Sequence, residues 1–311
     1  MTKKEIYYDS RDNQTKIHAV VWTPDTEPKA IIILVHGMAE HIERYDEFAQ
    51  FLCEKGYVVA GNDHLGHGKS TGRNPKGYFC RRDPATVVVR DVHRLKKTIQ
   101  NEYPTLPVVI FGHSMGSMIV RNYLTKYGTG VDAAVICGTL LMPKLLLHAL
   151  GAVLFVTRLC VGSKHPSKFL DKLAFGGYNR RIDNPVSSFD WVTSDKDKLN
   201  SYLNDPDCGF LFTVNGFHTL KVLSLRLHDK KLLNCIPKDL PVFFIYGGQD
   251  PCGEYGVAVR KVIEQYKELG IKTVESKEYP DDRHALIEEV NRAEVMEDVL
   301  GFIQSVLPDN K

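Results

Sequence analysis

Short runs of consecutive apolar residues recur along the chain, separated by longer segments whose apolar residues follow a helical period. Ala30–Val35 is the clearest run, and an unbroken apolar run of this length is typical of a strand buried on both faces of a sheet. Residues 16–22 mix β-branched and alternating positions and are expected to pair with residues 5–9. The predicted strands cover residues 5–9, 16–22, 30–35, 57–60, 107–111, 131–137, 242–246 and 272–278.

Helices are predicted between most of these strands, from apolar residues spaced three or four positions apart. Asp83 and Pro84 open one of them as an N-cap residue followed by proline at the first helical position. The closing helix begins at Asn291 with Glu294 three positions later, a spacing that resembles a capping box. The other predicted helices include residues 45–52, 117–127, 215–229 and 259–266. This alternation predicts an α/β fold with a mostly parallel central sheet flanked by helices, in which ligands bind beyond the carboxyl ends of the strands.

The alternation of strands and helices breaks after residue 137. Residues 139–213 begin with an apolar run and continue with segments rich in Pro, Gly, Asn and Asp, such as residues 176–179 and 205–207. We interpret this stretch as an insertion, because it does not read as another strand and helix of the sheet. The predicted α/β core therefore comprises residues 1–138 and 214–311, with the insertion at 139–213.

Composition and charge exclude several classes of protein. Hydrophobic residues make up 43% and charged residues 25% of the 311 residues, which argues against a disordered chain or a coiled coil. A net charge of +2 gives no electrostatic reason to expect a nucleic-acid partner. The seven cysteines follow no C-x-x-C or metal-ligand spacing, and no apolar segment follows Met1 as in a signal peptide. We therefore predict free thiols and a cytoplasmic location, and leave the oligomeric state open.

The motif Gly112-His113-Ser114-Met115-Gly116 follows a predicted strand and opens a predicted helix. Composition alone would produce G-x-S-x-G in roughly one chain of this length in ten, so the strand–turn–helix context carries the argument. A serine on such a turn is strained and exposed above the sheet, and the flanking glycines avoid collisions with neighbouring backbone. Ser114 is therefore the predicted nucleophile.

A serine nucleophile needs a general base, and the base needs an acid that orients it. On this architecture the three residues follow in the order Ser, Asp or Glu, His. Asp250 comes just after a predicted strand, and His284 comes after the next one, so both are expected at the same sheet edge as Ser114. Asp281 and Asp282 are competing acids, but they lie too close to His284 in the sequence for a fixed bond to its Nδ1.

Acyl transfer also needs N–H donors for the developing oxyanion. The backbone N–H groups of Met115, after the serine, and of Met38, after an early strand, are the candidates. His64 and His67 lie in a Gly-rich loop without a third ligand at a usual metal-site spacing. We predict that these two histidines hydrogen-bond the neighbouring His36-Gly37 turn and bind no metal.

Together these motifs resemble the α/β-hydrolase fold, and more narrowly its monoacylglycerol lipase and lysophospholipase-like branch. The resemblance covers about residues 5–305 and rests on the late Asp250 and His284 and on three motifs: His36-Gly37-Met38-Ala39-Glu40-His41 with Arg44-Tyr45, Asp63-x-x-Gly66-His67-Gly68-x-Ser70, and Gly112-His113-Ser114-Met115-Gly116. It implies that the insertion at 139–213 forms a helical cap over the active site. It also implies that Glu40 and Arg44 bind the alcohol part of a monoglyceride. Ala39 stands where the family usually carries glycine.

These observations predict a serine hydrolase that cleaves carboxylic esters without a cofactor or metal. Ser114 would attack the carbonyl carbon, His284 would transfer its proton to the leaving alcohol, and Asp250 would hold the imidazole in the required tautomer. Water activated by His284 would then release the acid from the acyl-serine. The resemblance implies a single-chain lipid ester as the substrate, a monoacylglycerol or a lysophospholipid.

Three alternatives stay open. An acyltransferase would use an alcohol in place of water on the same fold. An aminopeptidase would need acids for a substrate amine, and Asp195, Asp197, Asp205 and Asp207 offer such acids without a defined pocket. A binding module without catalysis would normally lack one member of the triad, and none is missing here.

The apolar run between Lys144 and Arg158 has thirteen residues. As a helix it spans about 20 Å, short of the roughly 30 Å hydrocarbon core of a bilayer. It lacks the polar face that a surface helix normally keeps. We therefore predict that it covers the pocket with one side and contacts a lipid surface with the other, and that replacing Leu150 and Leu154 would test this contact. The alternative is a helix buried against its own domain or a dimer partner.

Overall fold

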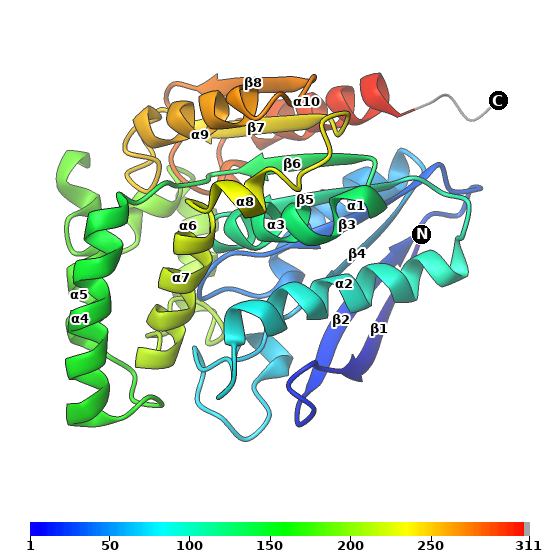
Figure 1. The fold of residues 1–311 in the computed structure, drawn as a ribbon. Coiled ribbons are helices and arrows are strands. Elements are labelled where there is room, and N and C mark those ends of the chain that lie inside the picture. The colour runs from blue at the N-terminus through cyan, green and yellow to red at the C-terminus, as the bar shows by residue number, and fades with distance from the viewer. Residues whose placement is uncertain (308–311) are drawn as a thin grey trace.

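The computed structural model describes residues 1–307 as a twisted sheet between two layers of helices, with further helices standing at one end (Figure 1). The strands are β1 (Thr2–Asp9), β2 (Lys16–Thr23), β3 (Ala30–Val35), β4 (Tyr57–Asn62), β5 (Val108–His113), β6 (Ala133–Cys137), β7 (Val242–Gly247) and β8 (Val274–Tyr279). The helices are α1 (Asp46–Glu54), α2 (Pro84–Glu102), α3 (Met115–Tyr127), α4 (Lys144–Val161), α5 (Lys168–Phe175), α6 (Lys196–Asn204), α7 (Val214–Arg226), α8 (Lys230–Leu233), α9 (Val257–Glu268) and α10 (Arg292–Val306).

All described strands belong to one eight-stranded sheet in the order β1-β2-β4-β3-β5-β6-β7-β8. β1 pairs with β2, and β2 with β4, in antiparallel fashion, and the other neighbours run parallel. The predicted pairing of residues 5–9 with 16–22 is present, with Glu5 opposite Val20 and Asp9 opposite Lys16. The mostly parallel α/β sheet predicted from the alternating pattern is thus confirmed.

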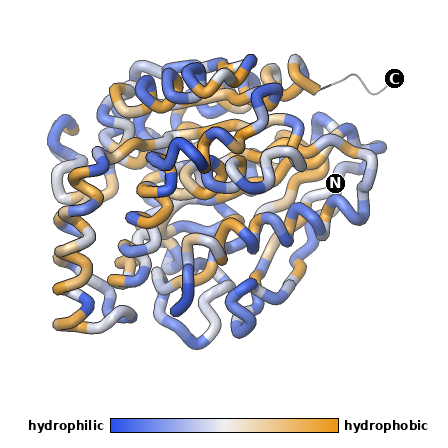
Figure 2. Tube along the Cα trace, viewed as in Figure 1, coloured by the Kyte–Doolittle hydropathy of each residue, from blue (hydrophilic) through white to orange (hydrophobic). Residues whose placement is uncertain are grey.

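The central strands are buried on both faces because helices cover the sheet on either side. Along β3, Ile31 and Ile33 contact a cluster with residues of α2, α3, α7 and α9, and Ile32 and Leu34 contact a second cluster with residues of α1 and α10. The hydrophobic residues concentrate accordingly along the central strands (Figure 2). An unbroken apolar run is what a strand needs when neither of its faces meets water.

The N-termini of α2 and α10 test the capping predicted from the sequence. Asp83 caps α2, since its side chain accepts the N–H of Thr86, and Pro84 is the first helical residue as predicted. The predicted capping box at Asn291 is wrong, because that side chain makes no capping hydrogen bond. Asn291 has φ −92° and ψ 20°, not the extended backbone of a capping residue, and its carbonyl oxygen accepts the N–H of Glu294 instead. The predicted helix at 215–229 corresponds to α7, which ends at Arg226, and the separate short helix α8 begins only after Asp229.

Residues 139–213, all within the described part of the chain, contribute no strand to the sheet. They form α4, α5 and α6, and in Figure 1 α4 and α5 stand beyond the carboxyl ends of the parallel strands. The division into a core and a cap at residues 138 and 213 stays a prediction.

α4 is apolar along most of its length (Figure 2). By length and composition alone it is the one helix among residues 1–307 that could cross a membrane, and 11% of it is buried. Leu147 and Leu154 face inward and are buried, whereas Leu145, Phe155 and Leu159 are 82%, 63% and 71% exposed. The alternative of a helix enclosed by its own domain is therefore wrong.

Candidate active site

Ser114 occupies the sharp turn between β5 and α3. Its backbone has φ 54° and ψ −120°, a conformation that residues other than glycine rarely adopt. The flanking glycines are required by close backbone contacts. A Cβ on Gly112 would lie 2.6 Å from the carbonyl oxygen of Gly116, and a Cβ on Gly116 would lie 2.0 Å from that of Val35. The tight turn therefore exists only with glycine at these two positions.

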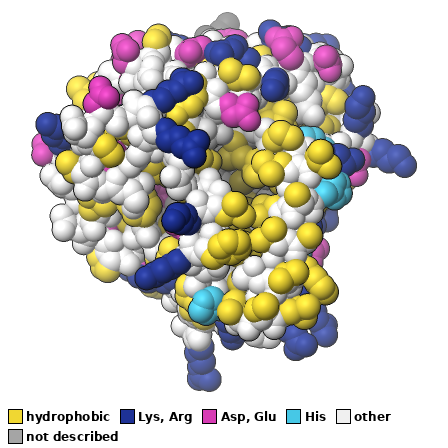
Figure 3. Space-filling model, turned by 90° about the vertical axis from the view of Figure 1, so that its left-hand side faces the viewer, with side chains coloured by type: hydrophobic (Ala, Val, Ile, Leu, Met, Phe, Trp, Pro, Cys, Tyr) yellow, Lys and Arg dark blue, Asp and Glu magenta, His cyan; other side chains and the backbone are white. Residues whose placement is uncertain are grey.

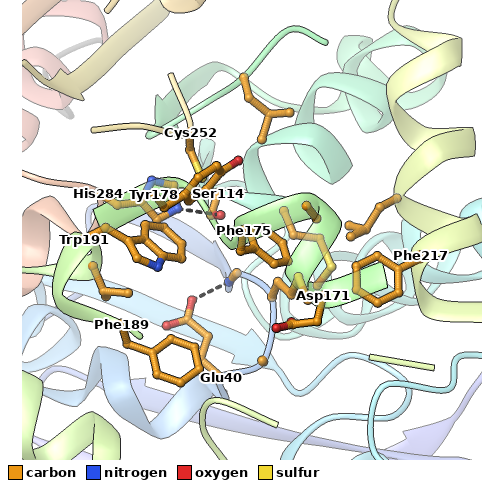
Figure 4. Close-up of a pocket in the computed structure, with 18 of the residues that line it drawn as sticks. Glu40, Ser114, Asp171, Phe175, Tyr178, Phe189, Trp191, Phe217, Cys252 and His284 are labelled. Carbon is orange, nitrogen blue, oxygen red and sulfur yellow. Dashed lines mark hydrogen bonds between the residues drawn. The ribbon is translucent and has the colours of Figure 1, made fainter. Parts of the chain in front are cut away.

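Loops from three strands bring Ser114, His284 and Asp250 together at one edge of the sheet. The Nε2 of His284 lies 2.7 Å from the Oγ of Ser114 (Figure 4). The Nδ1 of His284 lies 2.9 Å from the Oδ2 of Asp250. Asp250 is fully buried, so its carboxylate is shielded from water. Within the described residues, neither Asp281 nor Asp282 hydrogen-bonds the imidazole. Burial raises the pKa of Asp282 to about 6, and the charge of Glu289 adds to this shift.

The loop that carries His284 is fastened to the insertion. The guanidinium of Arg283 donates to the carbonyl oxygens of Asp190 and Thr193, at 2.7 and 3.0 Å. The N–H of the next residue, Ala285, donates to the carbonyl oxygen of Val192 at 2.7 Å. The position of the imidazole thus depends on the segment before α6.

The turn after β3 packs against the serine turn. A Cβ on Gly37 would lie 3.2 Å from the Cβ of Ser114, so the two turns touch with no room for a side chain. Ala39 has φ 51°, the left-handed conformation that favours glycine, so the chain keeps the shape of the turn despite the substitution. Met38 and Met115, whose N–H groups are the predicted oxyanion donors, both line the pocket at Ser114.

Glu40 is a buried carboxylate, and hydrogen-bond donors from neighbouring residues surround it. It accepts the N–H of Gly37 and the hydroxyl of Tyr45, and its oxygens lie 3.3 Å from the Nδ1 of His113 and 3.4 Å from the Nε of Arg44. Burial alone would raise the pKa of Glu40. The hydrogen bond and charge of His113 and the charge of Arg44 outweigh burial and hold that pKa well below its usual range.

His113 connects the Glu40 turn with the His284 loop, a role that its variable position before the serine of G-x-S-x-G does not reveal. Its Nδ1 faces Glu40 and the hydroxyl of Tyr45, and its Nε2 lies 3.2 Å from the carbonyl oxygen of His284. The only signal in the sequence is a polar residue at the end of an otherwise apolar buried strand.

Arg44, predicted to bind the alcohol of the substrate, is not among the described residues that line the pocket. Its guanidinium lies 3.1 Å from Glu288 and over the ring of Tyr202, with 4.9 Å to the ring centroid. Glu40 does line the pocket, but its oxygens already accept the internal hydrogen bonds described above.

A mostly apolar pocket opens at Ser114 beneath the insertion. The face that carries α4 and α5 is hollowed, and hydrophobic side chains gather around the hollow (Figure 3). Phe175, Trp191 and Phe217 form part of its wall, with Asp171 beside Phe217 on the side away from His284 (Figure 4). Burial raises the pKa of Asp171, and a polar carboxyl in this apolar wall is a feature that no sequence motif marks.

The four acids considered for an amine site lie elsewhere. None of them lines the pocket within the described residues. Asp197 is in the first turn of α6. Asp195, Asp205 and Asp207 pair with Arg292, His41 and Lys76, respectively.

His64 and His67 support the loop in different ways. The side-chain Nε2 of His64 lies 3.2 Å from the carbonyl oxygen of His36, so the predicted side-chain bond to the His36-Gly37 turn is present for His64, and its backbone N–H also donates to the Nε2 of His36 at 3.0 Å. For His67 the prediction is wrong, because its Nδ1 bonds the carbonyl oxygen of Leu65 and its ring packs against the ring of Phe212. Burial lowers the pKa of His67 to about 3. Both histidines act here as packed, hydrogen-bonded loop residues.

Three groups of potential metal ligands come together within the described residues, and one of them is Asp250, Cys252 and His284. In that group the Nδ1 of His284 is already hydrogen-bonded to Asp250. A metal ion would have to displace this bond, so the residues fit a hydrogen-bonded pair better than a metal site.

A mostly parallel sheet with a strained serine directly after β5 is the architecture of the α/β hydrolases. The family model of the serine aminopeptidases S33 matches residues 26–291. The chain belongs to this family. It is 29% identical to a monoacylglycerol lipase of Mycolicibacterium smegmatis over 291 residues, 92% of each chain.

Solved structures of an esterase and a lipase have the same fold as this chain. A carboxyl esterase from Bacillus coagulans, solved in complex with glycerol, superposes with a TM-score of 0.89 at 30% identity, over 98% of this chain and 99% of that one. A soluble variant of monoglyceride lipase from Saccharomyces cerevisiae, with a substrate analogue, shares the fold at a TM-score of 0.74 and 20% identity, over 99% and 97% of the two chains. The predictions of an α/β hydrolase and of its lipase-like branch are confirmed.

Proposed function

We propose that this chain hydrolyses single-chain lipid esters, monoacylglycerols or lysophospholipids, through an acyl-serine intermediate. The chain is a carboxylic ester hydrolase, as its lipase and esterase relatives support. The observation that carries the finer proposal is the 2.7 Å distance between His284 Nε2 and Ser114 Oγ at an apolar pocket. A nucleophile and base at hydrogen-bond distance, with the base oriented by a buried carboxylate, form the arrangement that acyl transfer requires.

In the first half-reaction the Oγ of Ser114 attacks the ester carbonyl carbon while His284 accepts its proton. Asp250 stabilises the imidazolium and keeps Nδ1 protonated, through the 2.9 Å bond. The N–H groups of Met38 and Met115 stabilise the oxyanion. His284 then protonates the leaving alcohol, and the acyl group remains on Ser114. Water, deprotonated by His284, attacks the acyl-serine, and His284 returns the proton to the Oγ of Ser114 as the fatty acid is released.

The pocket supports an acyl chain as the group transferred. Its wall is formed largely by side chains such as Phe175, Trp191 and Phe217, which offer apolar surface without competing for hydrogen bonds. We propose that residues 139–213 act as a cap that closes this pocket. The exposed apolar side of α4 fits peripheral contact with a lipid surface, from which such a substrate would be taken up.

The experiment is turnover by purified protein of p-nitrophenyl esters of increasing chain length, monoacylglycerols and lysophospholipids, with Ser114→Ala as the control. We expect hydrolysis by the wild type, with a preference for longer single chains, and none by the variant. Esterase activity that survives in Ser114→Ala would show that Ser114 is not the nucleophile. Addition of glycerol or short alcohols tests the acyltransferase alternative, because transfer would give new esters in place of free acid.

The aminopeptidase alternative now depends on Asp171. Among the described residues that line the pocket, Glu40 and Asp171 carry carboxylates. The carboxylate of Asp171 is the one that a substrate amine could reach, because the oxygens of Glu40 already accept internal hydrogen bonds. Hydrolysis of aminoacyl p-nitroanilides that is lost in Asp171→Asn would support this activity. We expect no such hydrolysis, because burial disfavours the charged form of Asp171 that an ammonium group needs.

A further inference from the structure

A second groove lies on the outer side of the pocket, between the C-terminal half of α4, the N-terminal half of α7 and the loop before α2. Six basic side chains line it: Arg81, Arg158, Lys164, His165, His218 and Lys221. Within residues 1–307, none of the six has a carboxylate at ion-pair distance. Asp83 is the one carboxylate among the described lining residues, and it already pairs with Arg226 at 3.0 Å. Lys164 lies over the ring of Tyr78, 5.1 Å from the ring centroid. The positive charges of the lysine and arginine side chains in this groove are therefore not balanced by a carboxylate.

Two features indicate that the charges converge within the groove. Arg158, His218 and Lys221 all line the groove, and burial together with the charges of Lys221 and Arg158 lowers the pKa of His218. Gly151, in the middle of α4, leaves room for the ammonium of Lys221, since a Cβ there would lie 3.0 Å from its Nζ. Glycine inside a helix is unfavourable relative to alanine, and here it leaves room for a charged side chain between α4 and α7.

The rim of the groove is apolar. Phe155 and Val161 line it and are 63% and 45% exposed, and Leu159 on the same helix is 71% exposed. A basic floor beside exposed apolar side chains is complementary to an anionic amphiphile, which carries its charge and its hydrocarbon close together. A small hydrophilic anion would use the floor alone.

We propose that this groove binds the phosphate group of an anionic phospholipid in a membrane surface. It thereby adds a lipid headgroup site to the peripheral contact proposed above. Arg158 and Lys164 contact the phosphate oxygens, and Phe155 and Leu159 contact the first methylenes of the acyl chains. Lys221 lines both the groove and the substrate pocket, so a bound headgroup lies next to the wall behind which the acyl chain sits.

Sedimentation of the full chain with vesicles tests this proposal. Vesicles of phosphatidylcholine alone are compared with vesicles that also contain phosphatidylglycerol. The test variant is Arg158→Gln with Lys164→Gln. The matched control is Lys168→Gln with Lys172→Gln, two exposed lysines of α5 outside the groove. We expect the test variant to lose roughly 30-fold in partition to the anionic vesicles, about fivefold for each charge, and the control to keep most of its affinity.

Several outcomes would overturn the proposal. Equal losses in the two double variants would mean diffuse electrostatic attraction, and an unchanged test variant would mean that the groove takes no part. Inorganic phosphate that stabilises the protein against heat in a groove-dependent manner, without any gain from phosphatidylglycerol vesicles, would identify a site for a free anion. Thermal unfolding of each variant shows whether it is folded.

The same preparations separate this site from the proposed catalytic function. Ser114→Ala must still bind anionic vesicles, and the groove variant must still hydrolyse a short soluble p-nitrophenyl ester. Vesicle binding without esterase activity in the wild type would refute the proposed function and leave the groove intact. Esterase activity without a preference for anionic vesicles would refute the lipid site in the groove and leave the proposed function intact.

Discussion

Glu40 can act in two ways that a single substitution separates. The family resemblance implies contact with the alcohol of the substrate, whereas its hydrogen bonds to Gly37 and Tyr45 hold the turn that carries the N–H of Met38. Glu40→Gln keeps the shape of the side chain and removes its charge. The amide oxygen can still accept from Gly37 and Tyr45, but the pair with Arg44 is lost.

The expected loss in the free energy of unfolding follows from the hydrogen bonds that Glu40→Gln weakens. A hydrogen bond to a charged group contributes about 1.5–3 kcal/mol and a neutral one about 1 kcal/mol. The difference is about 0.5–2 kcal/mol for each bond, so two such bonds lower the free energy of unfolding by about 1–4 kcal/mol. Arg44 keeps Glu288 at 3.1 Å, so no unpaired charge is left behind. One oxyanion donor contributes about 10²–10³-fold in kcat, so a loosened turn should cost about 10–100-fold.

The assay compares kcat and KM for a short p-nitrophenyl ester, which has no glycerol, with those for a monoacylglycerol. A role in the turn predicts the same loss of kcat on both substrates. A contact with glycerol predicts a higher KM for the monoacylglycerol alone. Glu43→Gln, the same change three residues along at a half-buried position outside the pocket, is the matched control. Normal kcat on the p-nitrophenyl ester would refute the role in the turn.

The effect of pH gives an independent check on Glu40. Its folded-state pKa is depressed, so the stability it contributes is present above the unfolded pKa of about 4.3 and is lost only as pH falls through the folded value. The difference in unfolding free energy between wild type and Glu40→Gln should therefore stay constant from about pH 6 to 8. A difference that changes across this range would point to another titrating group.

Four further predictions concern single residues. Ser114→Ala should lose about 10⁴-fold or more in kcat and should no longer be labelled by a fluorophosphonate, and a labelled variant would identify another serine as the nucleophile. Asp250→Asn should cost about 10⁴-fold in kcat, because the amide favours the wrong tautomer of His284, and near-normal turnover would move the acid elsewhere. Ala39→Gly should raise the free energy of unfolding by up to about 1 kcal/mol in urea denaturation, because the φ of 51° strains alanine. Burial raises the pKa of Asp91 to about 7, so its stabilising contribution should be lost as pH rises from about 4 to 7, by at most about 1.4 kcal/mol per pH unit. Urea unfolding of wild type and Asp91→Asn across this range should diverge, and parallel curves would count against a buried protonated carboxyl.

The strands of the core could be predicted because parallel strands bury both faces. Ala30–Val35 is unbroken in its apolar character and matches β3 at both ends. The end of β5 could not be placed as well, because Gly112 and His113 continue the strand without being apolar. Their place in the ladder depends on pairing with β6, which is a contact across the sheet and not a property of the segment.

The members of the proposed triad could be predicted to lie together because each follows a different parallel strand. Such loops meet at one sheet edge whatever their sequences are. The hydrogen-bond network around Glu40 and His113 could not be predicted from the sequence, because it depends on how closely the turn after β3 approaches the turn after β5. The 3.2 Å between a Cβ on Gly37 and that of Ser114 is set by the packing of both turns. No spacing along the chain carries this information.

The orientation of α4 shows where pattern alone gives no answer. A helix that is apolar nearly all round carries no polar stripe that could indicate which side faces water. Leu150 and Leu154 were expected to test lipid contact, but Leu150 lines the pocket at Ser114 and Leu154 is buried. Substitutions there would change the lining of this pocket or the packing of the helix. The side that can meet a lipid surface is the one with Leu145, Phe155 and Leu159, and only the position of α4 on α7 determines this.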